Sequence, residues 1–247
     1  MAFIDFQHVG VDFPIFASQN RSFKKSLMNI ATGGRIASDA TSAPVVRALD
    51  DINLRIDDGE RVGLLGCNGS GKSTLLRVLG GVYSPTAGRA EVSGSIGSLL
   101  DINLGTDGES TGIENIYLRG TLLGMTKSEI DRELPKIVEY SELGNFINLP
   151  MKTYSSGMQM RVAFTVSTQS APEVLLMDEW LAVGDQNFQR KAEERLSKLV
   201  EQTKILVIAS HSQELIRRVC NRAVWLDHGR LMMDSDPDTV CKAYFGR

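Results

Sequence analysis

The chain has 247 residues, of which 42% are hydrophobic and 23% charged, and its formal net charge is −3. The length allows one large α/β domain or a domain with a lobe. The slightly acidic charge excludes the strongly basic class of nonspecific nucleic-acid binders, so we expect no nucleic-acid partner. No apolar run approaches the ~18 residues that span a bilayer.

The cysteines and the first residues indicate the compartment. Cys67, Cys220 and Cys241 are scattered and form no metal-ligand pattern, which is typical of a protein in a reducing cytosol. The segment MAFIDFQHVGVDF has no basic start followed by an apolar core, so we do not expect a signal peptide. We expect a cytoplasmic protein, whose role at a membrane would depend on a partner.

The N-terminal region begins with a strand and continues into an insert. Residues 3–13 alternate between apolar and polar, which predicts an edge strand. Residues 20–31 then predict an amphipathic helix. Phe23, Leu27 and Ile30 share one stripe of this helix, and Arg21, Lys24 and Lys25 lie on the other side. The helix either packs on its own domain with solvated cations, or lies at a membrane surface beside anionic lipid or pyrophosphate.

A second strand signal, at Ile52–Ile56, leads to the most informative motif of the chain. Asp57–Gly59 predicts a hairpin turn, and Arg61–Leu65 predicts a short buried strand. Gly66–Leu79, with the sequence GCNGSGKSTLLRVL, follows as a glycine-rich loop and a helix. Strand, glycine loop and helix in this order are the context that makes a phosphate-loop motif specific.

The glycine-rich loop predicts an ATP site. Its glycines let consecutive backbone N–H groups turn inward around an anion, at the N-terminus of a helix. Lys72 can reach the terminal phosphates, and the Ser73 hydroxyl can bind Mg²⁺. The expected ATP-binding residues of the loop are Gly66, Cys67, Asn68, Gly69, Ser70, Gly71, Lys72, Ser73 and Thr74.

The rest of the chain predicts helices followed by buried strands. Residues 105–169 have a helical pattern, with helices expected at 112–125, 127–141 and 157–170, and we expect them to form a lobe inserted into the sheet domain. Strands are expected at Val174–Asp178, Lys204–Ala209, Ala223–Asp227 and Arg230–Met233, the last two joined by a tight turn at His228–Gly229.

Two carboxylates end the strand VLLMDEW, at residues 174–180. In a phosphate-loop protein, Asp178 at the end of a buried strand can hold Mg²⁺ beside the Ser73 hydroxyl. Glu179 can orient or deprotonate the water that attacks the γ-phosphate. The alternative is a buried strand that ends in acids at its solvent edge.

A second anion site is expected in YSSGMQMR, at residues 154–161. Ser155, Ser156 and Gly157 open a predicted amphipathic helix, where hydroxyls and backbone N–H groups gather. The alternative is a serine N-cap before a core helix.

The order of these three motifs resembles the ATP-binding subunits of ABC transporters, and the resemblance covers nearly the whole chain. In that family a signature, usually LSGGQ, closes on the ATP held by a second copy. This chain departs from the signature at Tyr154, Ser156 and Met158, and keeps Ser155 and Gly157. The resemblance implies ATP binding in trans by Ser155, Ser156, Gly157, Met158 and Asp185, where Asp185 takes the place of the family's aspartate across the dimer seam.

Three further residues are assigned by this resemblance alone. His211 matches the switch histidine that contacts the γ-phosphate, and Phe13 lies where an aromatic ring stacks on adenine, with Phe16 as a rival. Asp101 occupies the place of the glutamine that touches the metal and communicates with the membrane subunit. Aspartate is a departure there; its carboxylate could still bind Mg²⁺, directly or through water.

Within the family, residues 98–125, 181–194 and the insert look like the branch that exports polysaccharides. The resemblance implies one ABC ATPase domain over residues 1–247, with a helical subdomain at about 105–169 and an insert at about 17–48. We expect a homodimeric ATPase at the cytoplasmic face of the inner membrane. It would use ATP and Mg²⁺ and drive a polytopic membrane subunit that moves a lipid-linked glycan. The chain resembles short members without a carbohydrate-binding domain. The alternatives are another ABC transporter ATPase and a soluble ABC protein.

Overall fold

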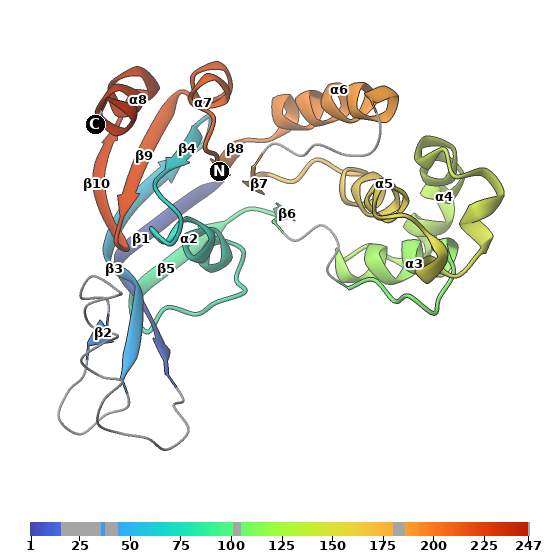
Figure 1. Ribbon diagram of the computed structural model, residues 1–247, viewed down its shortest axis with the longest axis horizontal. Coiled ribbons are helices and arrows are strands. Elements are labelled where there is room, and N and C mark those ends of the chain that lie inside the picture. Colours follow the sequence, from blue (N-terminus) through green and yellow to red (C-terminus); the bar gives the residue numbers. More distant parts are fainter. Residues whose placement is uncertain (16–35, 38–43, 101–104, 180–185, 247) are drawn as a thin grey trace. The chain divides into compact units, whose positions relative to one another are not determined.

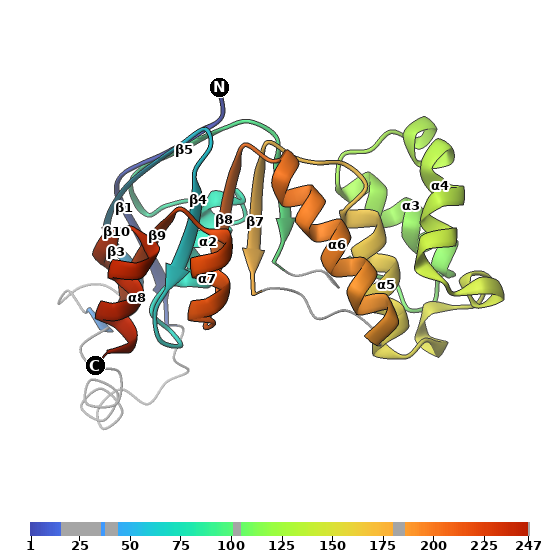
Figure 2. The same ribbon diagram turned by 90° about the horizontal axis from the view of Figure 1, so that it is seen from above.

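The computed structural model describes residues 1–15, 36–37, 44–100, 105–179 and 186–246. They form two compact units. Unit 1 comprises Met1–Gly94 and Ile205–Arg247, and unit 2 comprises Ser95–Lys204. Figures 1 and 2 label the helices and strands of both units.

Unit 1 contains an antiparallel sheet in which β1 (Phe3–Pro14) pairs with β3 (Val45–Asp57) on one side and β5 (Ala87–Ser93) on the other (Figure 1). The short β2 (Ile36–Ala37) pairs with the outer side of β3. The prediction that β1 is an edge strand is therefore wrong, because β5 covers its second edge. The alternating side chains of β1 that face inward, Ile4 and Phe6 among them, are buried.

The mixed sheet of unit 1 carries the buried strands. β4 (Arg61–Leu65) lies parallel between β8 (Ile205–Ala209) and β9 (Arg222–Asp227). The hairpin partner β10 (Arg230–Ser235) runs antiparallel to β9. Strands that are covered on both faces are continuous apolar runs, and β8 is buried along its whole length. The mixed sheet and the antiparallel N-terminal sheet confirm the expected α/β fold.

The turn at Asp57–Gly59 does not make a hairpin, so that prediction is wrong. β3 pairs with β1 and β2, whereas β4 pairs with β8 and β9, so the turn passes from one sheet to the other. The helices of unit 1 are α2 (Lys72–Leu79), α7 (Gln213–Val219) and α8 (Pro237–Phe245). Of these three helices of the described residues, the sequence patterns predicted α2; the helix predicted at residues 20–31 lies outside the described part of the chain.

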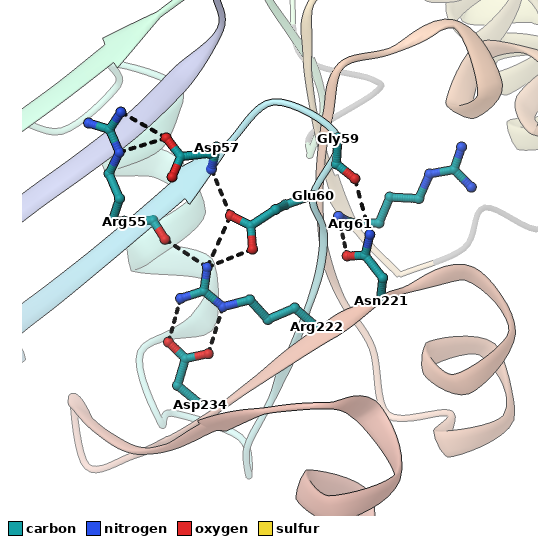
Figure 3. A network of polar contacts seen from close by, with 8 residues as sticks. All are labelled: Arg55, Asp57, Gly59, Glu60, Arg61, Asn221, Arg222 and Asp234. Atoms are coloured by element: carbon teal, nitrogen blue, oxygen red, sulfur yellow. Dashed lines mark hydrogen bonds and ion pairs between the residues drawn. The ribbon is translucent and has the colours of Figure 1, made fainter.

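A polar network joins this crossing turn to the mixed sheet (Figure 3). The Arg222 guanidinium donates to both Asp234 carboxylate oxygens at 2.7 and 2.6 Å, and to Glu60 at 2.9 Å. It also donates to the Arg55 carbonyl at 2.8 Å. The neighbouring Asn221 amide donates to the Gly59 carbonyl at 3.0 Å. Asn221 and Arg222, at the start of β9, thus connect the end of β3, the turn and β10.

Unit 2 contains the parallel strands β6 (Ile96–Leu99) and β7 (Val174–Asp178) and a group of helices. The α-helices are α3 (Gly112–Leu122), α4 (Lys127–Ser141), α5 (Ser156–Ser167) and α6 (Gln186–Gln202). Two short 3₁₀ turns, η1 (Gly144–Asn148) and η2 (Met151–Thr153), precede α5.

The first residues of α3 and α4 are marked by capping motifs in the sequence. Thr111 and Glu114 form a reciprocal capping box at the start of α3, and Thr126 and Glu129 form another at the start of α4. Both helices pack around a common core with α5. The three helices predicted in this region are confirmed, whereas α6 was not predicted. Within the described ranges, we find no helix with the length and apolar character needed to cross a membrane.

Candidate functional site

The glycine-rich loop of unit 1 connects the end of β4 to the first residue of α2, as predicted. Gly66 follows the last residue of β4, and Lys72 begins α2 directly after Gly71. Because Gly71 has no side chain, the first turn of α2 has no side-chain cap. The Leu75 N–H donates to the Gly71 carbonyl at 2.8 Å, so the helical hydrogen bonds begin at the loop itself.

Two glycines of the loop cannot be replaced without distortion. Gly66 has a φ of 154°, and a Cβ there would lie 2.4 Å from the Leu226 carbonyl oxygen. Gly71 has a φ of 111°, and its Cβ would lie 2.8 Å from the Ala48 carbonyl oxygen. Side chains rarely adopt this backbone conformation, and the neighbours are backbone atoms that cannot swing away. The cradle expected of a phosphate loop is therefore formed.

Lys72 lies inside this cradle. The side chain is 7% exposed, and its Nζ donates to the Gly66 carbonyl at 2.7 Å and to the Cys67 carbonyl at 3.2 Å. The Nζ group of Lys72 is therefore held inside the loop by two backbone carbonyls. The donor set fits a nucleotide: an ammonium and a glycine loop that opens onto an uncapped helix end.

The remaining loop residues divide into an outer and an inner group. Cys67, Asn68 and Gly69 are exposed, and the Cys67 Sγ lies 3.9 Å from an Asp227 carboxylate oxygen. Ser70 is fully buried, and its hydroxyl has no hydrogen-bond partner among the described residues. Ser73 and Thr74 are half-buried in the first turn of α2.

The turn between β9 and β10 contacts the glycine-rich loop. The sequence patterns did not reveal this contact. The Gly229 N–H donates to the Ser70 carbonyl at 2.8 Å, and the Gly229 carbonyl accepts from the Asp50 N–H of β3 at 2.9 Å. His228 and Gly229 have φ angles of 48° and 79°, so the tight turn that was predicted is confirmed. The residues of the turn were visible in the sequence, but the contacts of Gly229 with Ser70 and Asp50, far earlier in the chain, were not.

His211 lies in unit 1, two residues after the end of β8. Leu64 of β4 pairs in parallel with Ala209 of β8, so His211 and the glycine loop follow strands that end at the same edge of the sheet. The His211 side chain is exposed. Its role beside bound nucleotide stays a prediction.

Phe13 lies near the end of β1, opposite Val46 of β3. Its half-buried ring meets the ring of Tyr83 edge-on, with centroids 5.3 Å apart and an interplanar angle of 73°. Tyr83 belongs to the segment that follows α2, and no local sequence pattern pointed to it.

In unit 2, Asp178 is the last residue of β7, and Glu179 follows it directly. The four preceding residues of the strand are buried, Asp178 is half-buried, and Glu179 is exposed. Glu179 has a φ of 69°, an unusual backbone conformation for a residue other than glycine. Strain of this kind is concentrated at functional sites, so it marks Glu179 beyond what its sequence position indicated.

Ser155 is the N-cap of α5 in unit 2, and its hydroxyl accepts from the Met158 N–H at 3.2 Å. Ser155 and Ser156 are exposed, whereas Gly157 and Met158 are half-buried. The prediction that α5 is amphipathic is wrong, because all five residues of Val162–Val166 are buried and the helix is surrounded there.

Tyr154, which replaces the usual leucine of the signature, has a structural contact. Its hydroxyl donates to the Phe146 carbonyl at 2.6 Å, and burial raises the pKa of this phenol.

Several expected residues lie outside the described part of the chain. They are Asp101, Asp185, Phe16 and the predicted insert helix with Arg21, Phe23, Lys24, Lys25, Leu27 and Ile30. Among the described residues, no group of three or more histidine, cysteine, aspartate and glutamate side chains could hold a metal ion by itself. A Mg²⁺ site here would need hydroxyl and phosphate oxygens as well as carboxylates.

Comparison with known proteins agrees with this arrangement. The family model of the ABC transporter matches residues 49–182. Over 235 residues the chain is 40% identical to the O-antigen export system ATP-binding protein RfbE of Yersinia enterocolitica, covering 95% of this chain and 98% of that protein. It is 36% identical over 241 residues to the teichoic acids export ATP-binding protein TagH of Listeria monocytogenes, covering 98% of this chain and 69% of that protein.

Solved structures support the fold. The ATP-binding cassette MJ0796, a dimer in a post-hydrolysis state bound to ADP and Pi, has a TM-score of 0.67 at 21% identity and covers 95% of this chain and 98% of its own. An ATP-binding subunit of an ABC transporter has a TM-score of 0.69 at 19% identity, covering 99% and 93%. With the family model matching more than half of its length, and a relative that it covers almost from end to end, the chain belongs to the ABC transporter family.

Proposed function

We propose that this chain is the ATP-hydrolysing subunit of an ABC exporter that moves a lipid-linked polysaccharide across the cytoplasmic membrane. The observation that carries the proposal is the similarity to an O-antigen export ATP-binding protein along 95% of the chain. A teichoic acid export protein is similar over 98% of the chain. One relative is named for O-antigen export and the other for teichoic acids export, and from these names we infer a glycan as the substrate class of the complete transporter.

ATP binding follows from the glycine loop and Lys72. The backbone N–H groups of the loop and the N-terminus of α2 attract phosphate oxygens. The Lys72 ammonium would exchange its carbonyl partners, Gly66 and Cys67, for the terminal phosphates, whose negative charge makes the stronger hydrogen bonds. Residues 66–74 thus hold the triphosphate, and we infer that Phe13 stacks on the adenine ring.

Hydrolysis requires a base and a contact to the γ-phosphate. We infer that Glu179 accepts a proton from the attacking water, because its exposed carboxylate is held in an unusual backbone conformation at the end of a strand. His211 contacts the γ-phosphate. Ser73 and Asp178 carry hard oxygen donors of the kind Mg²⁺ prefers, and Asp101 is a further candidate ligand. When bound, Mg²⁺ neutralises charge on the β- and γ-phosphates.

A second copy of the chain would complete the nucleotide site. We infer that Ser155, Ser156, Gly157, Met158 and Asp185 of one copy contact the ATP held by the other. The exposed Ser155 and Ser156 begin α5, whose N-terminus favours an anion. ATP would then draw two copies together, and hydrolysis would release them, which gives a two-state switch biased by the γ-phosphate.

The remaining assignments concern the assembly. We propose a single ABC ATPase domain over residues 1–247, with a helical subdomain at about 105–169 and an insert at about 17–48. As a peripheral homodimer at the cytoplasmic face of the inner membrane, it would transmit its closure to a polytopic membrane subunit. The basic insert, with Arg21, Lys24 and Lys25, would face anionic lipid or the pyrophosphate of the lipid-linked glycan.

Deletion of the gene in the source organism tests the proposal. We expect loss of a surface polysaccharide and accumulation of its lipid-linked precursor inside the cell. The unaltered gene should restore export, and a gene encoding Lys72→Ala should not, although the variant is produced at an equal level. Normal surface polysaccharide in the deletion strain would refute the assignment of a glycan substrate.

A further inference from the structure

Tyr83 contacts the ring that we assign to adenine stacking. The Phe13 and Tyr83 rings meet edge-on with centroids 5.3 Å apart, within the range of favourable aromatic pairs. Both residues are half-buried. A phenylalanine near the end of a strand can rotate about two side-chain bonds, and an edge contact of this kind restricts that freedom.

The segment that carries Tyr83 is itself held at two points. At one end, the Val82 and Tyr83 N–H groups donate to the Arg77 carbonyl of α2, at 2.8 and 3.2 Å. The Arg77 guanidinium also lies 5.9 Å from the centre of the Tyr83 ring, within the distance of a cation–π contact. Because Lys72 begins the same helix, Tyr83 is tied to the element that holds the triphosphate.

At its other end, the segment is tied to β1 directly before Phe13. The Thr86 N–H and hydroxyl both donate to the Gly10 carbonyl, at 2.8 and 3.1 Å. The Thr86 hydroxyl in turn accepts from the Asp12 N–H at 3.1 Å. The backbone that carries Phe13 and the segment that carries Tyr83 are therefore fixed relative to each other by three hydrogen bonds.

We propose that Tyr83 is a positioning residue for nucleotide binding, which holds the Phe13 ring in the orientation that receives adenine. The proposal rests on the adenine role assigned to Phe13 above. A ring held in advance loses no rotational freedom when the nucleotide binds, so the contact contributes to affinity for the base and not for the phosphates. Tyr83 thereby links base recognition to α2, which begins with the phosphate-binding lysine.

The test compares a nucleotide with a probe that has no base. Dissociation constants for AMP-PNP and for tripolyphosphate, each with Mg²⁺, are measured by calorimetry on the full chain. Tyr83→Ala should weaken AMP-PNP binding about 2- to 12-fold, the worth of one aromatic pair, and leave tripolyphosphate binding unchanged. Tyr83→Phe should bind AMP-PNP as the unaltered chain does. The matched control is Val82→Ala, because Val82 is the neighbouring residue and is 66% exposed.

A double variant separates positioning from other effects. In a Phe13→Ala background, Tyr83→Ala should cause no further loss of AMP-PNP affinity, because the ring it positions is gone. An equal loss in both backgrounds would overturn the proposal, as would unchanged AMP-PNP binding in Tyr83→Ala when Phe13→Ala binds weakly. If Phe13→Ala itself binds AMP-PNP normally, the adenine role fails, and the proposal fails with it.

Damage to the loop would appear as lost tripolyphosphate binding. If Tyr83→Ala shows this loss, Tyr83→Leu, which keeps most of the side-chain volume, is measured in its place with the same expectations. Weakened tripolyphosphate binding in that variant too would assign Tyr83 a structural role and overturn the proposal.

Discussion

Replacement of Arg222 by methionine should destabilise unit 1 without changing its nucleotide site. Arg222 forms a two-pronged contact with Asp234 and also binds Glu60 and the Arg55 carbonyl (Figure 3). These carboxylates raise the pKa of the Arg222 guanidinium above its ordinary value, Asp234 more than Glu60. Methionine keeps the length and the apolar stem of the side chain and removes the charge and all its hydrogen bonds.

The expected decrease in the free energy of unfolding follows from how exposed Arg222 and its two carboxylate partners are. The Arg222, Glu60 and Asp234 side chains are 24%, 27% and 25% exposed. Fully exposed ion pairs contribute about 0.2–1 kcal/mol, and removing one partner of a buried pair costs about 3–5 kcal/mol. Glu60 would keep the Asp57 N–H donor at 2.7 Å, whereas Asp234 would lose both of its contacts to Arg222. We therefore expect Arg222→Met to lower the free energy of unfolding by an amount between these limits, about 2–3 kcal/mol.

Urea unfolding followed by circular dichroism measures this loss. The matched control is Arg89→Met, which removes a single ion pair with Glu91 whose side chains are 73% and 45% exposed. We expect the control to lose less than about 1 kcal/mol. ATP affinity below the unfolding transition should stay within about twofold for both variants, because Arg222 begins β9 and the loop contacts its other end. A loss for Arg222→Met no larger than the control would refute the reasoning.

Three further predictions concern the nucleotide site. Lys72→Ala should lose ATP binding measured by calorimetry, because it removes the charge inside the cradle; Lys127→Ala, at a lysine 80% exposed, is the control and should bind normally. Glu179→Gln should lower the ATPase rate about 10²- to 10⁴-fold while keeping ATP affinity, and sizing chromatography with ATP should show a stable dimer. At pH 8, iodoacetamide should modify the exposed Cys67 and spare Cys220, because burial raises the pKa of the Cys220 thiol to about 12, and ATP should protect Cys67.

Each of these predictions would be contradicted by a specific result. Normal ATP binding by Lys72→Ala would refute the phosphate-loop assignment, and an unchanged ATPase rate would remove Glu179 from the mechanism. Modification of Cys67 at the same rate with and without saturating ATP would contradict nucleotide binding at the glycine loop. Mass spectrometry of the peptides distinguishes Cys67 from Cys220.

The elements that were predictable from sequence have strong local signals. β4, the glycine loop and α2 follow one another with glycines where the backbone needs them, so the predicted strand Arg61–Leu65 and the order of strand, loop and helix were correct. The helices α3 and α4 begin at capping boxes, which are readable over four residues. The tight turn at His228–Gly229 was equally local.

The errors came from contacts between distant segments. Phe3–Pro14 alternates as an edge strand would, and nothing in that segment indicates that β5, some 80 residues later, pairs with its second edge. The Asp57–Gly59 turn has the residues of a hairpin, but which sheet each flanking strand joins depends on the whole chain. In α5, Val162 and Val166 pack in the core with α3 and α4, whereas Phe164 packs against Phe188 of α6. Periodicity within the helix could not reveal that both of these faces are covered.

In the candidate site, too, residues within one motif were predictable, whereas contacts between distant segments were not. The residues 66–74, Asp178 and Glu179 were visible as motifs. The support of the loop by Gly229 and Ala48, and the contact between Phe13 and Tyr83, join segments more than 20 residues apart. The roles of His211 and of Ser155 were inferred by resemblance, because a single histidine or a serine before a helix has no specific pattern of its own.

The most direct test of the account is ATP-driven transport in vesicles. The full chain and its membrane subunit are reconstituted into liposomes containing the lipid-linked glycan, with the ATP-binding subunit facing outward, and glycan that reaches the lumen is measured. We predict that ATP drives glycan into the lumen, that AMP-PNP does not, and that the Glu179→Gln variant does not with either nucleotide. Hydrolysis of ATP without movement of glycan, or equal movement with AMP-PNP, would contradict the claim that this ATPase drives polysaccharide export.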